Sequence, residues 1–144
     1  MADKLPAIIA FYENLTLATV DTLADLYAAE ATFKDPFNEV RGVDAIARIF
    51  HHMFVQVIEP RFVVTAKFNG DDGAMLLWDF HFRTRGFAGT GAQAMCIRGA
   101  SHLRFDTAGK VVEHRDYWDA AEELYAKLPL IGAVMRRLQK FGRA

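Results

Sequence analysis

The first sixty residues carry apolar side chains at the spacing of three to four residues that is typical of helices. Pro6 suits a first helical turn, and the pattern predicts a helix over about residues 5–18. Thr19 or Asp21 can cap a second, shorter helix. The first helix carries Ile8, Ile9, Phe11, Tyr12 and Leu15 on one face, and the second carries Leu23, Leu26 and Tyr27.

A third helix is expected between Gly42, which breaks the chain, and Pro60. Asp44 lies in its first turn, where a carboxylate complements the helix dipole. Its apolar stripe consists of Ile46, Ile49, Phe50, Met53 and Phe54. All three helices are therefore amphipathic and need a partner surface.

Beyond Pro60 the hydrophobic period changes from helical to alternating, which predicts a half-buried strand over residues 61–68. The turn residues 69–73 then predict an antiparallel hairpin with a strand over about residues 74–85. Two further strands are expected over about residues 93–105 and 110–118, with a turn between them at residues 106–109. These sequential hairpins would form a curved antiparallel sheet.

Helices followed by a meander of long strands are typical of an α+β fold, in which the helices cover one face of the sheet. A helix over about residues 119–127 and, after Pro129, a last amphipathic helix complete the chain. We expect one domain over residues 1–144, because this length suits one domain and no repeat or linker interrupts it. The apolar face of the last helix comprises Ile131, Val134, Met135 and Leu138.

Composition favours a compact fold with an aromatic interior, since 52% of the residues are hydrophobic and twelve are Phe. The net charge of −1 gives no basic excess for nucleic acid, so we expect no nucleic-acid partner. Phosphate-loop and dinucleotide spacings are missing, and no pair of the five histidines has a zinc spacing. We therefore expect neither a metal nor a cofactor.

Cys96 is the only cysteine, so an internal disulfide is excluded and a reducing compartment is the simpler assumption. No apolar run approaches the ~18 residues that a membrane span needs. These two observations predict a cytoplasmic protein.

The motif at residues 31–37, Ala-Thr-Phe-Lys-Asp-Pro-Phe, places an acid at the end of an apolar strand. Pro36 pushes Asp35 away from helical geometry, so the strand should stop or bend at this carboxylate. Two interpretations stay open. The carboxylate faces inward as a functional group, or it initiates a turn by accepting hydrogen bonds from nearby backbone amides.

The chain resembles the nuclear transport factor 2-like superfamily, which includes ketosteroid isomerase, SnoaL-like polyketide cyclases and limonene epoxide hydrolase. The order of elements and four motifs carry the resemblance: residues 31–37, Arg41-Gly42, residues 103–106 followed by 109–111, and residues 115–119. It implies a cone, in which a strongly curved, mostly antiparallel sheet wraps around N-terminal helices, here with an extra C-terminal helix. A ligand pocket would lie at the open end.

Ketosteroid isomerase implies roles for two residues of this chain. Asp35 matches its general base, and Tyr12 matches the tyrosine that holds the oxyanion. The acid that donates a second hydrogen bond in that enzyme falls at Ser101 here. A serine hydroxyl can donate but is not a carboxylic acid, so the resemblance does not imply steroid isomerisation itself.

Limonene epoxide hydrolase points to a different acid. Asp116 matches a catalytic aspartate of that enzyme, which has asparagine where Asp35 stands. Its arginine between two aspartates has only His81 and Arg83 as nearest candidates. The chain thus combines two site patterns.

Strand parity groups further candidates, because side chains alternate between the two faces of a strand. His114, Asp116 and Trp118 share one face. On the preceding hairpin, amphipathicity would turn the face of Trp78, Phe80 and Phe82 inward, whereas the resemblance turns Leu77, Asp79 and His81 inward. We follow the resemblance, and expect the three aromatic rings to be buried in a homodimer interface.

The tail differs from the rest of the chain in charge. Residues 127–144 contain five bases and no acid, against twelve bases and eighteen acids before them. A basic amphipathic helix can lie on an anionic membrane surface, or pack its apolar face on its own or a partner subunit, or cover the pocket mouth. We expect the packing role.

The residues and the resemblance together predict a cofactor-independent enzyme that transfers protons on a hydrophobic small molecule, as an isomerase, cyclase or dehydratase. Asp35 would be the base, Tyr12 the oxyanion donor, and His114 with Asp116 a second acid/base pair. Three alternatives stay open: a non-catalytic carrier, hydration of an epoxide by Asp116, and a protein-interaction module. The residues expected to bind substrate are Ser101, Asp79, His81, Phe33, Ile49, Phe50, Met53 and Trp118.

Overall fold

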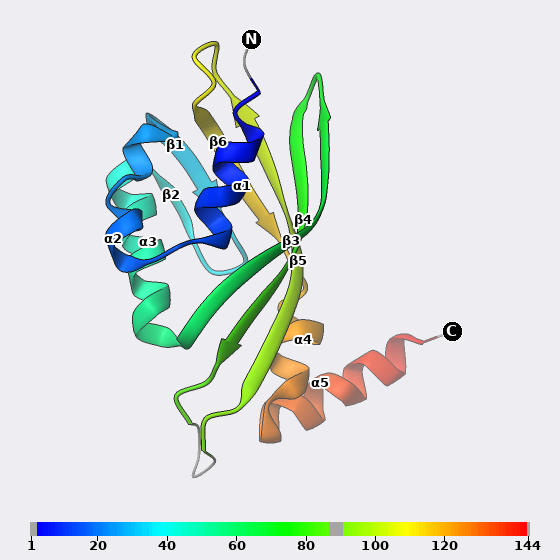
Figure 1. Ribbon diagram of the computed structural model, residues 1–144. Helices are drawn as coiled ribbons and strands as arrows, with labels where there is room; N and C mark the ends of the chain where they lie inside the picture. The colour runs from blue at the N-terminus through cyan, green and yellow to red at the C-terminus, as the bar shows by residue number, and fades with distance from the viewer. Residues whose placement is uncertain (1–2, 87–90, 144) are drawn as a thin grey trace.

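The computed structural model describes residues 3–86 and 91–143. Three helices and a 3-10 turn precede or interrupt the first strands and pack on one face of a single sheet (Figure 1). Their bounds are α1 Leu5–Glu13, α2 Leu17–Val20, η1 Leu23–Asp25 and α3 Val43–Gln56. The first helix ends earlier than predicted because Thr16 and Thr19 form a capping box that starts α2.

Six strands form the sheet in the order β2-β1-β6-β5-β4-β3. All neighbouring strands are antiparallel except β1 and β6, which are parallel. Irregularities in the pairing of β3 with β4 and of β5 with β6 bend the long strands, as bulges do. The bounds are β1 Tyr27–Lys34, β2 Glu39–Arg41, β3 Ile58–Gly70, β4 Gly73–Arg83, β5 Ala94–Phe105 and β6 Val111–Tyr117.

The predicted α+β architecture is confirmed, with a curved, mostly antiparallel sheet wrapped around the N-terminal helices. The core lies between α1, α3 and the concave face of the sheet. Side chains from α1, α3 and the sheet are fully buried there, among them Ile8, Ile46, Leu76 and Leu103. Tyr27, expected in a helix, instead begins β1 and is buried.

The orientation predicted for β4 is wrong. Trp78, Phe80 and Phe82 point into the cone, and Phe62 stacks on Phe80 with ring centroids 4.5 Å apart. Burial of three aromatic rings outweighs the pattern implied by the resemblance. A homodimer packed through these rings is therefore excluded, and Asp79 and His81 lie on the outer face, away from the pocket. Dimerisation by another surface stays a prediction.

The C-terminal segment lies on the other side of the sheet from α1–α3 (Figure 1). It comprises α4 Ala120–Glu123, η2 Tyr125–Lys127 and α5 Pro129–Gly142. Glu123 accepts a hydrogen bond of 2.8 Å from Arg98, and Lys127 donates one of 2.6 Å to the Cys96 carbonyl, so α4 and η2 are tied to β5.

The apolar face of α5 does not pack on its own sheet, contrary to our expectation. Ile131, Val134 and Leu138 are 46–59% exposed. The element that α5 contacts most is η2, the turn directly before it. None of the helices in residues 3–86 and 91–143 is long and apolar enough to cross a membrane.

Candidate functional site

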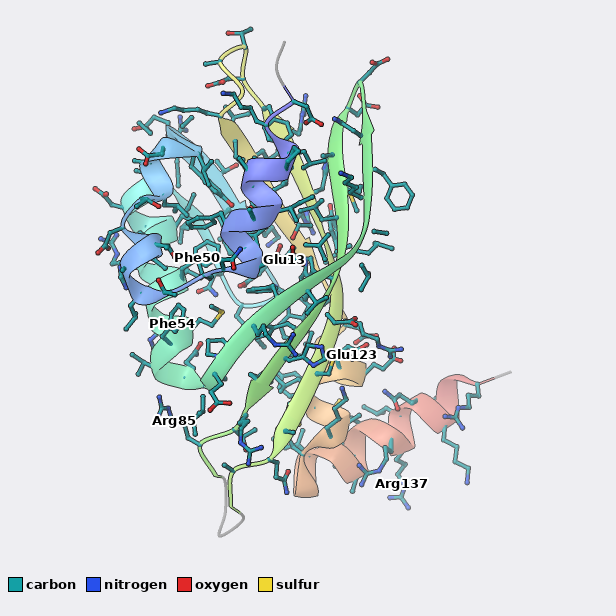
Figure 2. The ribbon with its side chains drawn as sticks, viewed as in Figure 1. Glu13, Phe50, Phe54, Arg85, Glu123 and Arg137 are labelled. Atoms are coloured by element: carbon teal, nitrogen blue, oxygen red, sulfur yellow. The ribbon has the colours of Figure 1, made fainter. Side chains whose placement is uncertain are left out.

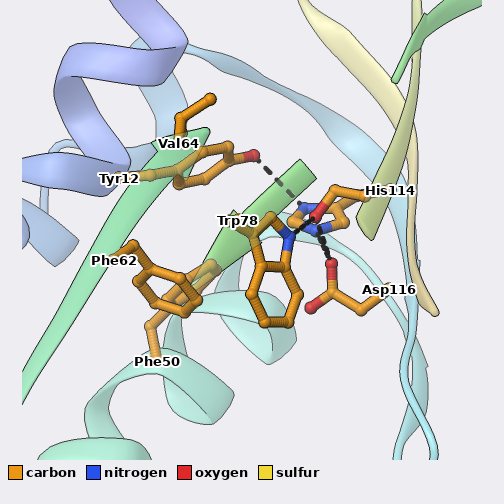
Figure 3. A pocket seen from close by; sticks show the side chains of 8 residues that line it. Tyr12, Phe50, Phe62, Val64, Trp78, His114 and Asp116 are labelled. Atoms are coloured by element: carbon orange, nitrogen blue, oxygen red, sulfur yellow. Dashed lines mark hydrogen bonds and ion pairs between the residues drawn. The ribbon is translucent and has the colours of Figure 1, made fainter. Parts of the chain in front are cut away.

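A narrow pocket lies inside the cone, between α1, α3 and the concave face of the sheet (Figure 3). Its cavity volume is only about 20 Å³, room for about one water molecule, so a ligand enters only if the lining side chains move apart. Its walls are mostly aromatic or aliphatic, with polar groups concentrated on β5 and β6. The lining residues are Tyr12, Phe50, Phe62, Val64, Trp78, Ser101, His114 and Asp116.

Asp116 is held at this pocket by two hydrogen bonds to the same oxygen. Ser101 Oγ donates to Oδ1 over 2.5 Å, and His114 Nε2 lies 2.6 Å from Oδ1. Trp78 Nε1 in turn donates to Ser101 Oγ over 2.8 Å, which orients the serine hydroxyl toward the carboxylate. Within the described residues, no protein group bonds the second oxygen, Oδ2. This oxygen is thus free to meet a ligand.

The other side of the His114 ring meets two buried tyrosines. Tyr27 OH lies 2.6 Å and Tyr12 OH 3.3 Å from His114 Nδ1, and the two hydroxyl oxygens are 2.5 Å apart. In a neutral imidazole whose Nε2 donates to Asp116, Nδ1 is the acceptor, and this tautomer satisfies both contacts. Tyr27 would then donate to Nδ1, and Tyr12 to Tyr27.

Burial keeps the hydroxyl groups of Tyr12 and Tyr27 protonated. Desolvation raises the pKa of both hydroxyls, well above the ordinary value of 10.0 for Tyr27. Both phenols are therefore protonated hydrogen-bond donors at neutral pH. His114 is only 3% exposed, whereas the Asp116 side chain is 17% exposed, so the network runs from the core to the pocket surface.

Asp35 lies outside this pocket. Its Oδ1 accepts hydrogen bonds from the backbone amides of Phe37 (2.8 Å) and Asn38 (2.6 Å), and from the Asn38 side chain (3.1 Å). The turn that was one interpretation of the Asp-Pro dipeptide is thus present. Asp35 does line a wider outer hollow of about 600 Å³, open to solvent, which it shares with Asp116 and Trp118.

The other predicted site residues divide between wall and support. Phe50 lines the pocket, and Phe33 packs behind it, with its ring 6.2 Å from Phe50 and 4.8 Å from His114. Ile49 and Met53 are half-buried against the core. Tyr12, Ser101, His114 and Asp116 are brought together as the sequence analysis predicted.

Four site residues were missed: Tyr27, Phe62, Val64 and Trp78. The alternation of apolar residues in β3 and β4 is the signal that could have placed Phe62, Val64 and Trp78 inward. Tyr27 gave no such signal, since Leu23, Leu26 and Tyr27 have helical spacing.

A second group of reactive side chains occupies the outer face. The ligating atoms of Asp79, His81 and Cys96 lie within 4.8 Å of one another, and His81 is paired with Cys96 across β4 and β5. A carboxylate, an imidazole and a thiol could supply three ligands to a divalent cation such as Zn²⁺. This face is remote from the pocket, so His81 does not serve as a partner for Asp116.

The pocket can carry out proton transfer in a largely dry environment. Asp116 offers a fixed carboxylate, His114 a titratable ring that contacts it, and Tyr12 a phenol at the same wall. The apolar walls suit a hydrophobic molecule with one or a few polar atoms.

Comparison with solved structures finds the same fold at low identity. A hypothetical protein with a ketosteroid isomerase-like fold from Catenulispora acidiphila, in complex with trimethylamine, is 16% identical with a TM-score of 0.70, over 87% of this chain and 92% of that one. A protein described as a SnoaL-like polyketide cyclase from Shewanella putrefaciens is 20% identical with a TM-score of 0.69, over 86% and 97%. AclR from Streptomyces galilaeus, described as a hydroxylase, is 20% identical with a TM-score of 0.64, over 84% and 91%.

No curated protein matches the chain. The model of the SnoaL-like domain, however, matches residues 8–114, from α1 to His114 in β6. Since this match spans most of the sheet, most of α1 and all of α2 and α3, the chain belongs to the SnoaL-like domain family.

Proposed function

We propose that this protein is a cofactor-independent enzyme that transfers protons on a hydrophobic small molecule, as an isomerase, cyclase or dehydratase. The observation that carries the proposal is the position of Asp116. One of its oxygens is fixed by Ser101 and His114 while the other has no protein partner among the described residues. A base held in this way keeps a single orientation toward the substrate.

The base would act on an acidic carbon next to a carbonyl group. Asp116 Oδ2 takes the proton, the electron pair of the C–H bond moves toward the carbonyl oxygen, and an enolate forms. Where a C=C bond is conjugated with the enolate, returning the proton to the far carbon of that system isomerises the substrate. Attack of the enolate carbon on a second carbonyl of the same molecule closes a ring and leaves an alkoxide that takes the proton. In each case the proton that Asp116 accepts is given back.

An enolate oxygen needs a hydrogen-bond donor in a site that excludes water. Tyr12 lines the pocket, and its hydroxyl can turn from Tyr27 toward a ligand. The raised pKa of this phenol keeps its proton in place at neutral pH, so Tyr12 would donate without being ionised. His114 would hold the orientation of Asp116 and stabilise its charge.

The substrate class follows from the walls. Phe50, Phe62 and Trp78 surround the pocket, so a planar or cyclic apolar molecule would pack against their rings. Relatives with this fold that are described as polyketide cyclases support an oxygenated ring system of this kind. Any ring-sized substrate requires these aromatic side chains to move apart, because the cavity of about 20 Å³ holds about one water molecule.

A carrier for a hydrophobic ligand is the second candidate, since the mostly apolar walls could hold such a ligand without any chemical step. In a carrier, the network around Asp116 would hold a polar atom of the ligand and no proton would be exchanged. The ligand would leave unchanged.

Exchange of α-protons for deuterium separates the two candidates without knowledge of the true substrate. Aryl ketones, whose α-protons exchange slowly in buffer, are incubated with the protein in D₂O and followed by NMR. We expect exchange above the buffer rate for at least one compound, and a loss of ~100-fold or more in Asp116→Asn. Asparagine keeps the acceptor oxygen for Ser101 and His114 but cannot take up the proton.

Asp35→Asn is the matched control, because it makes the same chemical change in the neighbouring hollow. It should retain exchange, since its carboxylate is used by the turn. If Asp35→Asn loses exchange and Asp116→Asn keeps it, the base has been misassigned. If compounds bind but none exchanges with the wild type, the carrier replaces the enzyme.

A further inference from the structure

The last helix, α5, stands away from the body of the protein (Figure 1). Two residues in its first eight contact η2: Arg136 Nη1 donates to the carbonyl of Ala126 over 2.5 Å, and buried Gly132 packs against the same carbonyl. A Cβ atom at Gly132 would lie 2.7 Å from that oxygen, so this contact is close. The rest of the helix extends beyond it.

An apolar stripe runs along the free part of α5. Ile131, Val134, Leu138 and Phe141 follow one another at intervals of three and four residues and therefore share one face. Their exposed fractions are 46%, 54%, 59% and 91%, increasing toward the end of the helix. Contiguous exposed apolar surface of this kind marks a binding surface.

Every ionisable side chain of this segment is basic. From residue 127 onward the sequence has no acid and five bases, which are Lys127, Arg136, Arg137, Lys140 and Arg143. At 100° per residue, Arg136 and Lys140 lie opposite the apolar stripe and Arg137 lies on its flank, while Arg143 follows the end of the helix. Figure 2 shows the side chain of Arg137 pointing away from the body of the protein. The helix thus has one apolar face and one cationic face.

We propose that α5 binds the surface of an anionic lipid bilayer, with its axis parallel to the membrane plane. The apolar stripe would enter the boundary between headgroups and acyl chains, and the basic side chains would reach the anionic headgroups. An anionic bilayer is complementary to both faces at once. The helix is too short and too polar to span, so the contact is with one surface.

A second copy of the chain fits these observations less well. A stable dimer usually buries about 800 Å² and 20–30 residues of each partner, whereas α5 offers a stripe of four side chains on a helix of 14 residues. Such a stripe suffices for a peripheral membrane helix, in which apolar burial and charge attraction add.

The test is cosedimentation of the full-length protein with vesicles of phosphatidylcholine alone or mixed with phosphatidylserine. We expect binding to the mixed vesicles, weaker binding as salt is added, and little binding to phosphatidylcholine alone. The double variant Arg137→Gln/Lys140→Gln should bind about 30-fold more weakly, about fivefold for each charge near the surface.

Two further variants make the result specific. Val134→Ser/Leu138→Ser should abolish binding while leaving the thermal midpoint unchanged, because both side chains are exposed. Arg61→Gln/Lys67→Gln on β3 removes two exposed bases elsewhere and should bind like the wild type.

The proposal is overturned if the wild type and Arg137→Gln/Lys140→Gln bind the mixed vesicles equally. It is also overturned if the wild type does not bind the mixed vesicles. If sedimentation velocity shows a dimer that Val134→Ser/Leu138→Ser converts to a monomer, the stripe belongs to a protein interface instead. None of these outcomes depends on whether Asp116 is a base.

Discussion

Gly99 in β5 offers a sharp test of how the pocket wall is packed, because it lies under the Trp78 ring. A Cβ atom at Gly99 would approach three carbon atoms of that ring to 2.4, 2.7 and 2.8 Å, closer than side chains tolerate. Two contacts hold the Trp78 ring in this position. Ser101 accepts a hydrogen bond from its Nε1, and Phe62 meets it edge-on with centroids 5.4 Å apart.

Gly99→Ala should therefore destabilise the protein although it adds only a methyl group. Overpacking a core costs typically 1–3 kcal/mol, and replacing glycine returns about 0.4–1 kcal/mol by restricting the unfolded chain. A net loss of about 1–2 kcal/mol corresponds to a fall of about 2–8 °C in the melting temperature for a chain of this size.

Denaturation in urea, followed by tryptophan fluorescence, measures this change. Trp78 is 6% exposed, and its displacement toward water should also shift the native emission to longer wavelength. Gly70→Ala is the control, since a Cβ atom there meets nothing within 4 Å. If Gly99→Ala is as stable as Gly70→Ala, Trp78 does not pack against β5, and the inward orientation of the aromatic face is refuted.

Two more predictions concern titration and metal binding. Burial raises the pKa of Tyr12 and Tyr27 above 10.0. The unfolded chain therefore releases these protons at a lower pH than the folded protein does. The free energy of unfolding should fall above pH ~10, by about 1.4 kcal/mol per pH unit for each tyrosine. Urea denaturation at about pH 9 and about pH 11 measures this loss, and a slope that Tyr12→Phe does not reduce would contradict it. No metal was expected from the histidine spacings, but the ligating atoms of Asp79, His81 and Cys96 cluster on the outer face, so we now predict that Zn²⁺ binds there and slows alkylation of the Cys96 thiol. His81→Ala should remove this protection and His102→Ala should not, while an unchanged alkylation rate in zinc would exclude the site.

The fold was predictable because its signals are local. The change of hydrophobic period at Pro60 and the turn residues at 69–73 and 106–109 fix the order of helices and hairpins. Boundaries were less certain, since Thr16 and Thr19 cap each other by side-chain contacts that compete with continuation of the first helix.

The site was predictable only in part, because its assembly depends on contacts distant in sequence. Strand parity predicts that His114 and Asp116 lie on the same face. The contact of Tyr27 with His114, however, depends on the pairing of β1 with β6, which no pattern in the sequence of either strand predicts. Asp35 shows the opposite difficulty. A motif typical of a catalytic acid and one typical of a turn are identical in sequence, and only the amides of Phe37 and Asn38 distinguish them.

The parallel pairing of β1 with β6 has a consequence for the order of folding. Tyr27 and His114 are 87 residues apart in the chain, so their contact closes a long loop at a large entropic cost. The hairpins of β3 with β4 and of β5 with β6 are joined by short turns and should form earlier. We therefore expect the pocket to be absent from early intermediates, and ligands that need the tyrosine–histidine network to bind only the completed fold.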